Sequence, residues 1–288
     1  MKPFLVSVSL VTFALASVFA GETPHAEKRG YHLFSPTPPD QMRELSTDRP
    51  DTTESAYTVD AGHFQVETDL LSFSYDRHNR ERSKVRTETW SWGATNFKVG
   101  LLNNVDLQLV VPFYNRVRSD DRATRTAGTQ QGFGDLTARV KMNLWGNDGG
   151  STALGLMPFV KVPTAQDDLG NGSVEGGLII PLSVSLPAGW SMGLMAEFDF
   201  LEDDERGSYH TDFVNSITFS HDLVGALGGY FEFVSIATTE TAGAWNATLD
   251  LGLTYGVTKD LQLDAGVNLG LTRGADDLSP FVGVSWRF

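Results

Sequence analysis

The chain has 288 residues, of which 36 are acidic and 22 basic, so its formal net charge is −14, and it contains no cysteine. Apolar residues make up 41% of the chain, which is too much for a disordered protein. Without cysteine there is no disulfide scaffold, zinc–thiolate site or cysteine nucleophile. The net negative charge makes nucleic acid a poor partner, because its phosphates would be repelled.

Residues 1–20 have the pattern of a secretory signal peptide. Lys2 supplies a positive start, residues 4–18 form an almost unbroken apolar stretch, and Ala20 is a small residue suited to cleavage. A membrane anchor is the rival interpretation, but the stretch is short for a spanning helix and polar sequence follows it. We therefore expect export and cleavage after Ala20, which together with the lack of cysteine points to a bacterial envelope.

Residues 21–61 are predicted to form an irregular periplasmic N-terminal segment. They are polar, contain five prolines and show no sustained hydrophobic periodicity. The densest polar stretch is 46–55, with the sequence Ser-Thr-Asp-Arg-Pro-Asp-Thr-Thr-Glu-Ser. The plain interpretation is a flexible, solvated linker with local turns.

From residue 62 to residue 288, apolar residues recur at every second position in one segment after another. Leu249, Leu251 and Leu253, for example, alternate with Asp250 and Gly252, and a period of two indicates a strand with two different faces. Short connections rich in Asn and Gly, which are expected to supply positive φ angles, alternate with longer polar ones. This predicts an antiparallel up-and-down meander of about twelve strands, at roughly 62–76, 86–101, 105–118, 132–146, 151–164, 173–186, 189–201, 209–221, 224–237, 243–256, 260–272 and 279–288.

The face that meets water decides between a soluble sandwich and a transmembrane β-barrel. The predicted strands are about 12–15 residues long, whereas strands of globular sheets average about 5–6 residues, and about 9–11 tilted residues cross a bilayer. Aromatic residues near the strand ends suit a girdle at the lipid–water boundary, and closing the barrel removes exposed strand edges. These residues are Trp90, Trp92, Phe113, Trp145, Trp190, Phe198, Phe200, Trp245, Tyr255, Trp286 and Phe288. We therefore predict an all-β, transmembrane barrel over residues 62–288.

Two stretches carry resemblances to known proteins. The last strand, residues 280–288, alternates and ends with Trp286 and Phe288, and it resembles the C-terminal signature that the barrel assembly machinery recognises in bacterial outer-membrane proteins. Residues 46–51, 53–55, 62–67 and the Gly-Phe-Gly-Asp-Leu stretch at 132–136 resemble the family named for the MetA pathway of phenol degradation. That resemblance implies an outer-membrane barrel that passes small molecules, and the phenol label does not establish a substrate.

The alternation also predicts which charged side chains line the lumen. Strands on one arc turn basic residues inward, strands seven to eleven turn acidic residues inward, and the two arcs lie roughly opposite in a ring of twelve. Such a transverse field favours small polar or zwitterionic solutes, unless the opposite charges pair across the lumen and close it. Glu67 and Asp69 on the first strand weaken this two-arc pattern. The lumen-lining candidates are Lys98, Arg139, Lys141, Lys161, Glu197, Asp199, Glu232, Asp250 and Asp264.

The predicted function is a passive outer-membrane channel for small molecules, either aromatic or small and polar, with no cofactor and no metal. A structural or adhesive barrel with a closed lumen is the alternative, and an outer-membrane lipid hydrolase is a weaker one. Catalysis is not expected, because no Gly-x-Ser-x-Gly motif occurs, His78 and His221 fall in predicted connections, and His210 with Asp212 suggests only an inward polar pair. The expected partners are outer-membrane lipid, lipopolysaccharide near acidic loops, the barrel assembly machinery and a small-molecule solute.

Overall fold

A computed structural model describes residues 28–77, 85–203, 207–240 and 243–288 of the chain. The predicted signal peptide and His78 lie outside the described residues. Helical structure in the described ranges is limited to two three-residue 3-10 helices, η1 (Lys28–Gly30) and η2 (Pro187–Gly189). None of the helices found there is long and apolar enough to cross a bilayer.

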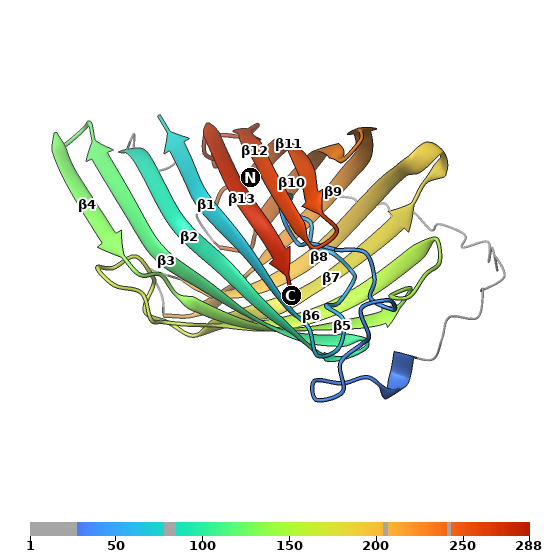
Figure 1. Cartoon of the computed structure of the whole chain (residues 1–288). Helices are drawn as coiled ribbons and strands as arrows, with labels where there is room; N and C mark the ends of the chain where they lie inside the picture. The colour runs from blue at the N-terminus through green and yellow to red at the C-terminus, as the bar shows by residue number, and fades with distance from the viewer. Residues whose placement is uncertain (1–27, 78–84, 204–206, 241–242) are drawn as a thin grey trace, which may run out of the picture.

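Thirteen strands make up nearly all the regular structure (Figure 1). They are rich in alternating apolar and small polar residues, which suit a pleated surface with two different faces. Their bounds are β1 (Phe64–Asp76), β2 (Val85–Leu102), β3 (Val105–Asp121), β4 (Thr126–Gly132), β5 (Leu136–Trp145), β6 (Thr152–Val162), β7 (Glu175–Ser185), β8 (Trp190–Glu202), β9 (Tyr209–Val224), β10 (Leu227–Thr238), β11 (Asn246–Thr258), β12 (Leu261–Gly270) and β13 (Leu278–Arg287).

Twelve of these strands close into one antiparallel ring. Neighbours in sequence pair around the whole sheet, and β1 pairs with β13 to complete the circle. The exception is β3, which pairs with β4 over its half near the long loops and with β5 over its other half. The predicted twelve-stranded up-and-down barrel is therefore confirmed, with β4 as an extra strand beside the ring in a stretch predicted to be a loop.

The predicted strands match the observed ones closely, with three local differences. β5 begins at Leu136, where residue 132 was predicted. β9 runs on through His221 to Val224, so this histidine lies in a strand and the turn falls at Gly225, whose φ of 58° suits glycine. Asn103 and Asn104 are not among the described residues with positive φ, so the β2–β3 turn does not use the expected asparagine conformation.

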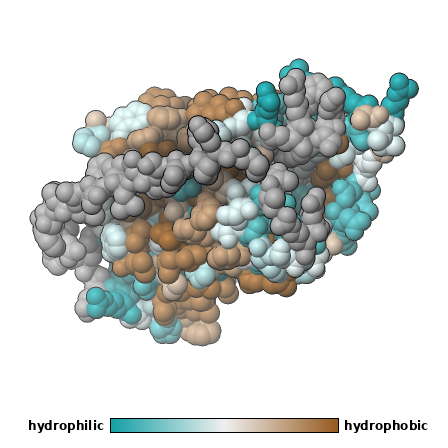
Figure 2. Space-filling model, turned by 180° about the vertical axis from the view of Figure 1, so that it is seen from behind, coloured by the Kyte–Doolittle hydropathy of each residue, from teal (hydrophilic) through white to brown (hydrophobic). Residues whose placement is uncertain are grey.

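The outer face of the ring is apolar. Figure 2 shows hydrophobic residues gathered over the middle of the molecule, with hydrophilic residues toward its ends. Large apolar side chains such as Leu109, Phe231, Leu253 and Val282 are exposed on the strands. Nine of the eleven predicted girdle aromatics are also exposed, and Trp90 and Phe198 are half-buried. An exposed apolar band around a closed barrel is the surface expected to face lipid.

The inner face is not uniformly polar. Buried apolar residues from five neighbouring strands, β6 to β10, form a cluster of Met157, Ile179, Met195, Val214 and Val234. The Glu54 backbone N–H lies 3.5 Å from the Met195 sulfur, which places this cluster on the interior side. The expectation of a wholly hydrophilic lumen was therefore too simple, because part of the interior packs as a small hydrophobic core.

The N-terminal residues enter the barrel from the end that carries the short turns. η1 lies below that end and the blue chain after it runs back toward the strands (Figure 1). Leu33 N–H donates to the Leu101 carbonyl at 2.9 Å, next to the β2–β3 turn. The C-terminus lies at the same end, where Phe64 and Phe288 exchange backbone hydrogen bonds of 2.9 and 3.0 Å. Both ends of the described chain thus lie on the short-turn side, as the even strand number requires.

Candidate functional site in the barrel interior

Residues 43–61, the inner segment, cross the lumen of the barrel. Their polar side chains contact strands on all sides, and Thr53, Ala56, Thr58 and Asp60 are buried. The interpretation of this stretch as a solvated linker is therefore wrong. No hydrophobic periodicity marks it, because its fixed position comes from ion pairs and hydrogen bonds to distant strands.

The basic side chains predicted on one arc of the lumen bind acidic side chains of the inner segment. Lys98 on β2 and Lys141 on β5 both contact the Asp48 carboxylate, and Lys98 also contacts Glu67 of β1. Arg139 contacts Glu54 at 2.6 Å. Both lysines are almost completely buried, so these pairs hold the segment firmly against β2 and β5.

Two acidic residues predicted on the other arc also bind the inner segment. Asp264 on β12 accepts from the Arg49 guanidinium at 2.6 Å, and the same guanidinium contacts Asp69 of β1. The Glu232 carboxylate on β10 accepts the backbone N–H groups of Thr52 and Thr53, both at 2.8 Å. The turn at Arg49–Thr53 is thus held by carboxylates from three strands.

The remaining lumen candidates do not contact the inner segment through ion pairs. Lys161 pairs with Glu175 on the neighbouring strand β7. Glu197 and Asp199 lie half-buried on β8. Asp250 is 1% exposed and lies opposite Glu232 of the neighbouring strand β10.

The inner segment lies between the two predicted arcs. The interior charges therefore neither face each other across open water nor pair directly across the lumen, since most pair with residues 48–54. Sequence reasoning missed the contribution of Asp48, Arg49 and Glu54. One signal in the sequence could have indicated them: several charged side chains were predicted to face a narrow interior, where buried charges need partners.

The two sides of the inner segment differ in packing. Toward the short-turn halves of β1, β2, β3 and β5, which we call the paired wall, backbone and side chains meet without space. The Val59 N–H donates to Asp106 at 2.9 Å, and the Asn143 side chain donates to the Ala56 carbonyl at 2.8 Å. A Cβ atom on Gly100 would lie 2.1 Å from the Asp60 carbonyl oxygen, so glycine permits this close approach.

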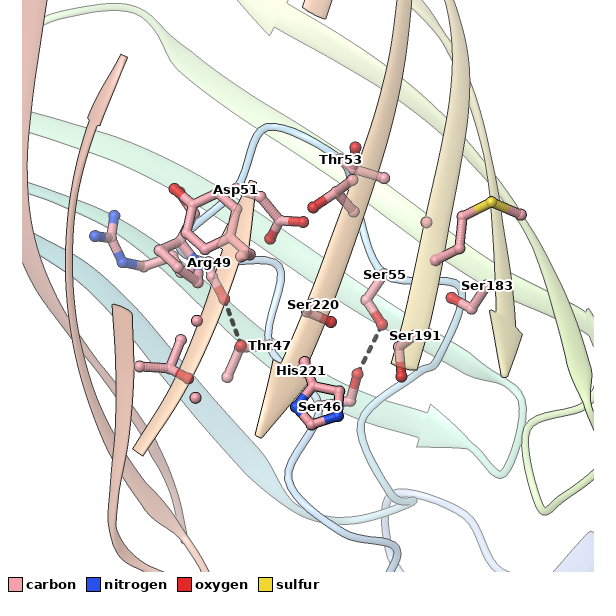
Figure 3. Close-up of a pocket in the computed structure, with 18 of the residues that line it drawn as sticks. Ser46, Thr47, Arg49, Asp51, Thr53, Ser55, Ser183, Ser191, Ser220 and His221 are labelled. Carbon is pink, nitrogen blue, oxygen red and sulfur yellow. Dashed lines mark hydrogen bonds between the residues drawn. The ribbon is translucent and has the colours of Figure 1, made fainter. Parts of the chain in front are cut away.

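Toward the short-turn halves of β7 to β12, which we call the hollow wall, a central cavity of about 350 Å³ remains. Figure 3 shows Ser183, Ser191, Ser220 and His221 of this wall around the inner segment. Ser46 and Ser55 of the segment lie within hydrogen-bond distance of each other, 2.7 Å apart, and also border the cavity (Figure 3). The lining is dominated by hydroxyl groups and glycines.

Three more cavities border the inner segment, and one of them, of about 410 Å³, lies between residues 43–45 and the turn after β11. A loop-end cavity of about 350 Å³ lies among β1, β2, β12 and β13, near the long loops. A turn-end cavity of about 920 Å³ lies at the short-turn end, next to Asn147 and Asp148. At its rim, burial pushes the Asp148 pKa upward, but hydrogen bonds from Asn103 and Lys28 and the charge of Arg43 together bring that pKa below its usual value.

Neither a metal site nor a serine–histidine pair emerges from the described ranges. No group of three or more His, Cys, Asp or Glu side chains there could hold a metal ion. His210 lies 3.5 Å from Asp212, and the ring nitrogens of His221 contact the backbone carbonyls of Ala188 and Asp222. No serine hydroxyl in these ranges hydrogen-bonds to a histidine ring, so this geometry gives the hydrolase alternative no support.

Comparisons with known proteins agree with the barrel. Residues 47–288 match the model of the family described as "Putative MetA-pathway of phenol degradation". The COG4313 outer membrane channel from Pseudomonas putida F1 is 14% identical with a TM-score of 0.64, over 84% of this chain and 100% of that one. The NanC porin is 12% identical with a TM-score of 0.49, over 77% and 98%. At such low identity the first similarity shows the fold alone. No curated protein sequence matches the chain.

Proposed function

Because the chain belongs to the family described as "Putative MetA-pathway of phenol degradation", we propose that it is a bacterial outer-membrane channel for passive diffusion of small molecules. The observation that carries the proposal is the barrel itself, with an apolar outer band and cavities along a largely polar interior. In a closed ring each strand pairs its backbone N–H and C=O groups with a neighbour on both sides, as a β-structure that spans lipid requires. The interior then supplies the path.

The solute is expected to be small, and either aromatic or polar. The family name refers to phenol, which combines an aromatic ring with a hydroxyl group. Both kinds of surface exist inside this barrel, since the cluster around Met195 is apolar and the central cavity is lined by hydroxyl groups. We propose diffusion down a gradient, without a cofactor and without a catalytic step.

The inner segment also gives a specific reason to keep the closed-lumen alternative. Residues 43–61 occupy much of the interior, and buried ion pairs hold them there. A barrel filled in this way could act as a structural or adhesive protein only. Conduction decides between the two functions, because a closed barrel passes neither ions nor solutes.

The test is reconstitution of the full mature protein. A channel gives discrete conductance steps in a planar bilayer, and liposomes that contain it swell when phenol or a small sugar enters. The matched control is the same preparation heat-denatured before reconstitution. Bilayers that hold folded protein and never conduct would support the closed barrel and exclude the channel.

Location and assembly partners form part of the same proposal. The signal-like residues 1–20 support export and cleavage, with residues 28–61 entering the barrel from the periplasm. The exposed apolar band supports contact with outer-membrane lipid and lipopolysaccharide. Phe288 stacks on Phe64 with 5.9 Å between ring centroids and lies beside Trp286, at the seam where the ring closes. That position supports recognition of the terminal strand by the barrel assembly machinery.

A further inference from the structure

We propose that solutes cross this barrel along one side of the inner segment only, through the loop-end, central and turn-end cavities in series, and that this route accepts small hydrogen-bonding solutes that carry no negative charge. The inference rests on the proposed channel function and adds the route and the class of solute.

The three cavities follow one another from one end of the barrel to the other. The loop-end and central cavities share Arg49, Pro50 and Asp51 as lining residues. The central and turn-end cavities share five lining residues, among them Tyr57 and Ser220. Neighbouring cavities that share walls need only small side-chain movements to connect, so together they span the barrel.

The opposite side of the inner segment offers no such path. Asp48 binds Lys98 and Lys141 there, and the backbone at Gly100 already touches the backbone at Asp60. Gln108 and Lys141 on this side are 0% and 1% exposed. A solute on this side would have to break buried ion pairs, which is strongly unfavourable.

Short side chains create the free space along the hollow wall. The inward positions of β7 to β10 carry Ser183, Ser191, Gly193, Thr218, Ser220 and Gly228, and all but Gly228 lie opposite one another on adjacent strands. The serines among them, Ser183, Ser191 and Ser220, are too short to reach across to the inner segment as Lys98 and Arg139 do on the other wall, whereas Gly193 lies directly against Thr53. The cavity is therefore a consequence of residue size at consecutive inward positions.

The turn at Arg49–Asp51 lines both the loop-end and the central cavity and therefore lies between them. The Pro50 carbonyl accepts from the Tyr230 hydroxyl at 3.4 Å, and the Arg49 guanidinium spans Asp69 and Asp264. A solute must pass this turn, either beside it or after a small displacement of it. The Arg49 pairs thus set the constriction.

The charges along the route set its preference. Every basic residue that lines these cavities, namely Lys28, Arg43 and Arg49, forms ion pairs. Asp40, Glu44 and Asp222 also line them, and in the described residues none of these carboxylates has an ion-pair partner. The surplus of uncompensated carboxylates repels anions, while the hydroxyl lining can donate to and accept from neutral solutes.

The first test narrows the route. Ser220→Trp places an indole in the wall shared by the central and turn-end cavities, and single-channel conductance should fall at least about fivefold. The control is Leu253→Trp on the outer face of β11, where the side chain is exposed toward lipid, and its conductance should match the wild type. Both variants are first checked for the heat-modifiable gel mobility of a folded barrel.

The second test avoids bulky substitutions and uses the lack of native cysteine. In Ser220→Cys, a small thiol-reactive methanethiosulfonate reagent should block conductance within seconds. The matched control is Ser285→Cys, an inward-facing position that is 0% exposed and lines none of the three cavities, where the same reagent should have no effect.

The third test measures selectivity by the reversal potential in a KCl gradient. The wild type should prefer K⁺ to Cl⁻, and Asp222→Asn should lower that ratio about twofold. Asp168→Asn, in an exposed loop outside the cavities, should leave the ratio unchanged.

The outcomes separate the route from the channel itself. A wild type that conducts, with Ser220 variants that behave like their controls, would overturn the route and leave the channel function standing. A wild type that prefers Cl⁻ would overturn the solute class. A folded wild type that never conducts would remove the channel function, and the route with it.

Discussion

The paired wall and the hollow wall face the same inner segment, yet one is closed and the other open. On the paired wall, long charged side chains such as Lys98, Lys141 and Arg139 reach the segment and end in ion pairs. On the hollow wall, Ser183, Ser191 and Ser220 are too short to do so, and a cavity of about 350 Å³ remains. Inward side-chain length therefore decides which side of a partly filled barrel can conduct.

The two walls also have different tasks, because one binds the inner segment tightly and the other lets solutes move past it. Buried charges on the paired wall hold the segment because an unpaired charge in that place is very costly. Hydroxyl groups on the hollow wall bind water or solute weakly and exchange partners quickly, as a passage requires. The paired wall thus anchors the segment through several ion pairs, whereas β10 and β12 hold it only at the Arg49–Thr53 turn and the hollow wall leaves room beside the rest of it.

Removal of the inner segment should abolish the difference between the walls and give the largest effect. A mature chain that lacks residues 21–60 keeps all twelve ring strands, and its single-channel conductance should rise about tenfold because the lumen is then open on both sides. The control lacks only residues 21–42 and should stay within about twofold of the wild type. Equal conductance of the two deletions would show that the inner segment does not limit passage.

Loss of the Asp48 charge should loosen the segment from the paired wall. In Asp48→Asn, Lys98 keeps only Glu67, and Lys141 keeps Glu54 at 3.9 Å. We expect docking of the segment to weaken by about 3 kcal/mol, as for a broken buried pair. The measurement is the rate at which a protease cleaves within residues 43–61 of the detergent-purified barrel.

Asp40→Asn is the matched control for this prediction. Asp40 is exposed and forms no ion pair within the described part of the chain. Its cleavage rate should equal that of the wild type. Equal protection in both variants would contradict the view that Asp48 anchors the segment.

A single added methyl group should distinguish the walls by their packing. In Gly100→Ala on the paired wall, the new Cβ meets the Asp60 carbonyl oxygen at 2.1 Å, and backbone cannot move aside easily. We expect a loss of about 1–3 kcal/mol in segment docking. In Gly228→Ala on the hollow wall, the nearest atom is the Thr254 hydroxyl at 2.7 Å, which can rotate away. Proteolysis of the segment in both variants is the measurement, and equal effects would contradict unequal packing.

The smallest expected effect is a pH dependence at the turn end. The Asp148 pKa is below its usual value, so the stabilisation it supplies is fully present above the unfolded-state pKa of about 3.9. That stabilisation is lost as the pH falls through the lower, folded-state pKa. Hydrogen exchange of residues 28–43 should therefore quicken slightly below about pH 4, and Asp148→Asn should show no such step. A wild-type profile that stays flat to pH 2 would contradict this linkage.

Much of the fold could be predicted because apolar and polar residues alternate within each strand, independently of the strands beside it. Leu249 to Leu253 alternate regardless of what lies beside them, and the strand count follows from twelve such stretches. β4 escaped prediction because Thr126–Gly132 is polar and glycine-containing and pairs only with the end of β3. The inward direction of Lys98, Lys141 and Asp264 followed from the same alternation, but their partners did not.

The sequence alone determined a barrel of this size with an apolar outer face, because apolar and polar residues alternate locally along each strand. Only the folded structure brings Asp48 to Lys141, 93 residues away in sequence, and Arg49 to Asp264, 215 residues away, because these pairs form when the ring closes around the inner segment. A buried charge pairs with whichever opposite charge the folded ring places within reach, and that distance has no local signature. For the same reason the cavity beside the segment exists only in the assembled barrel, since it is the space that short side chains on several strands leave together.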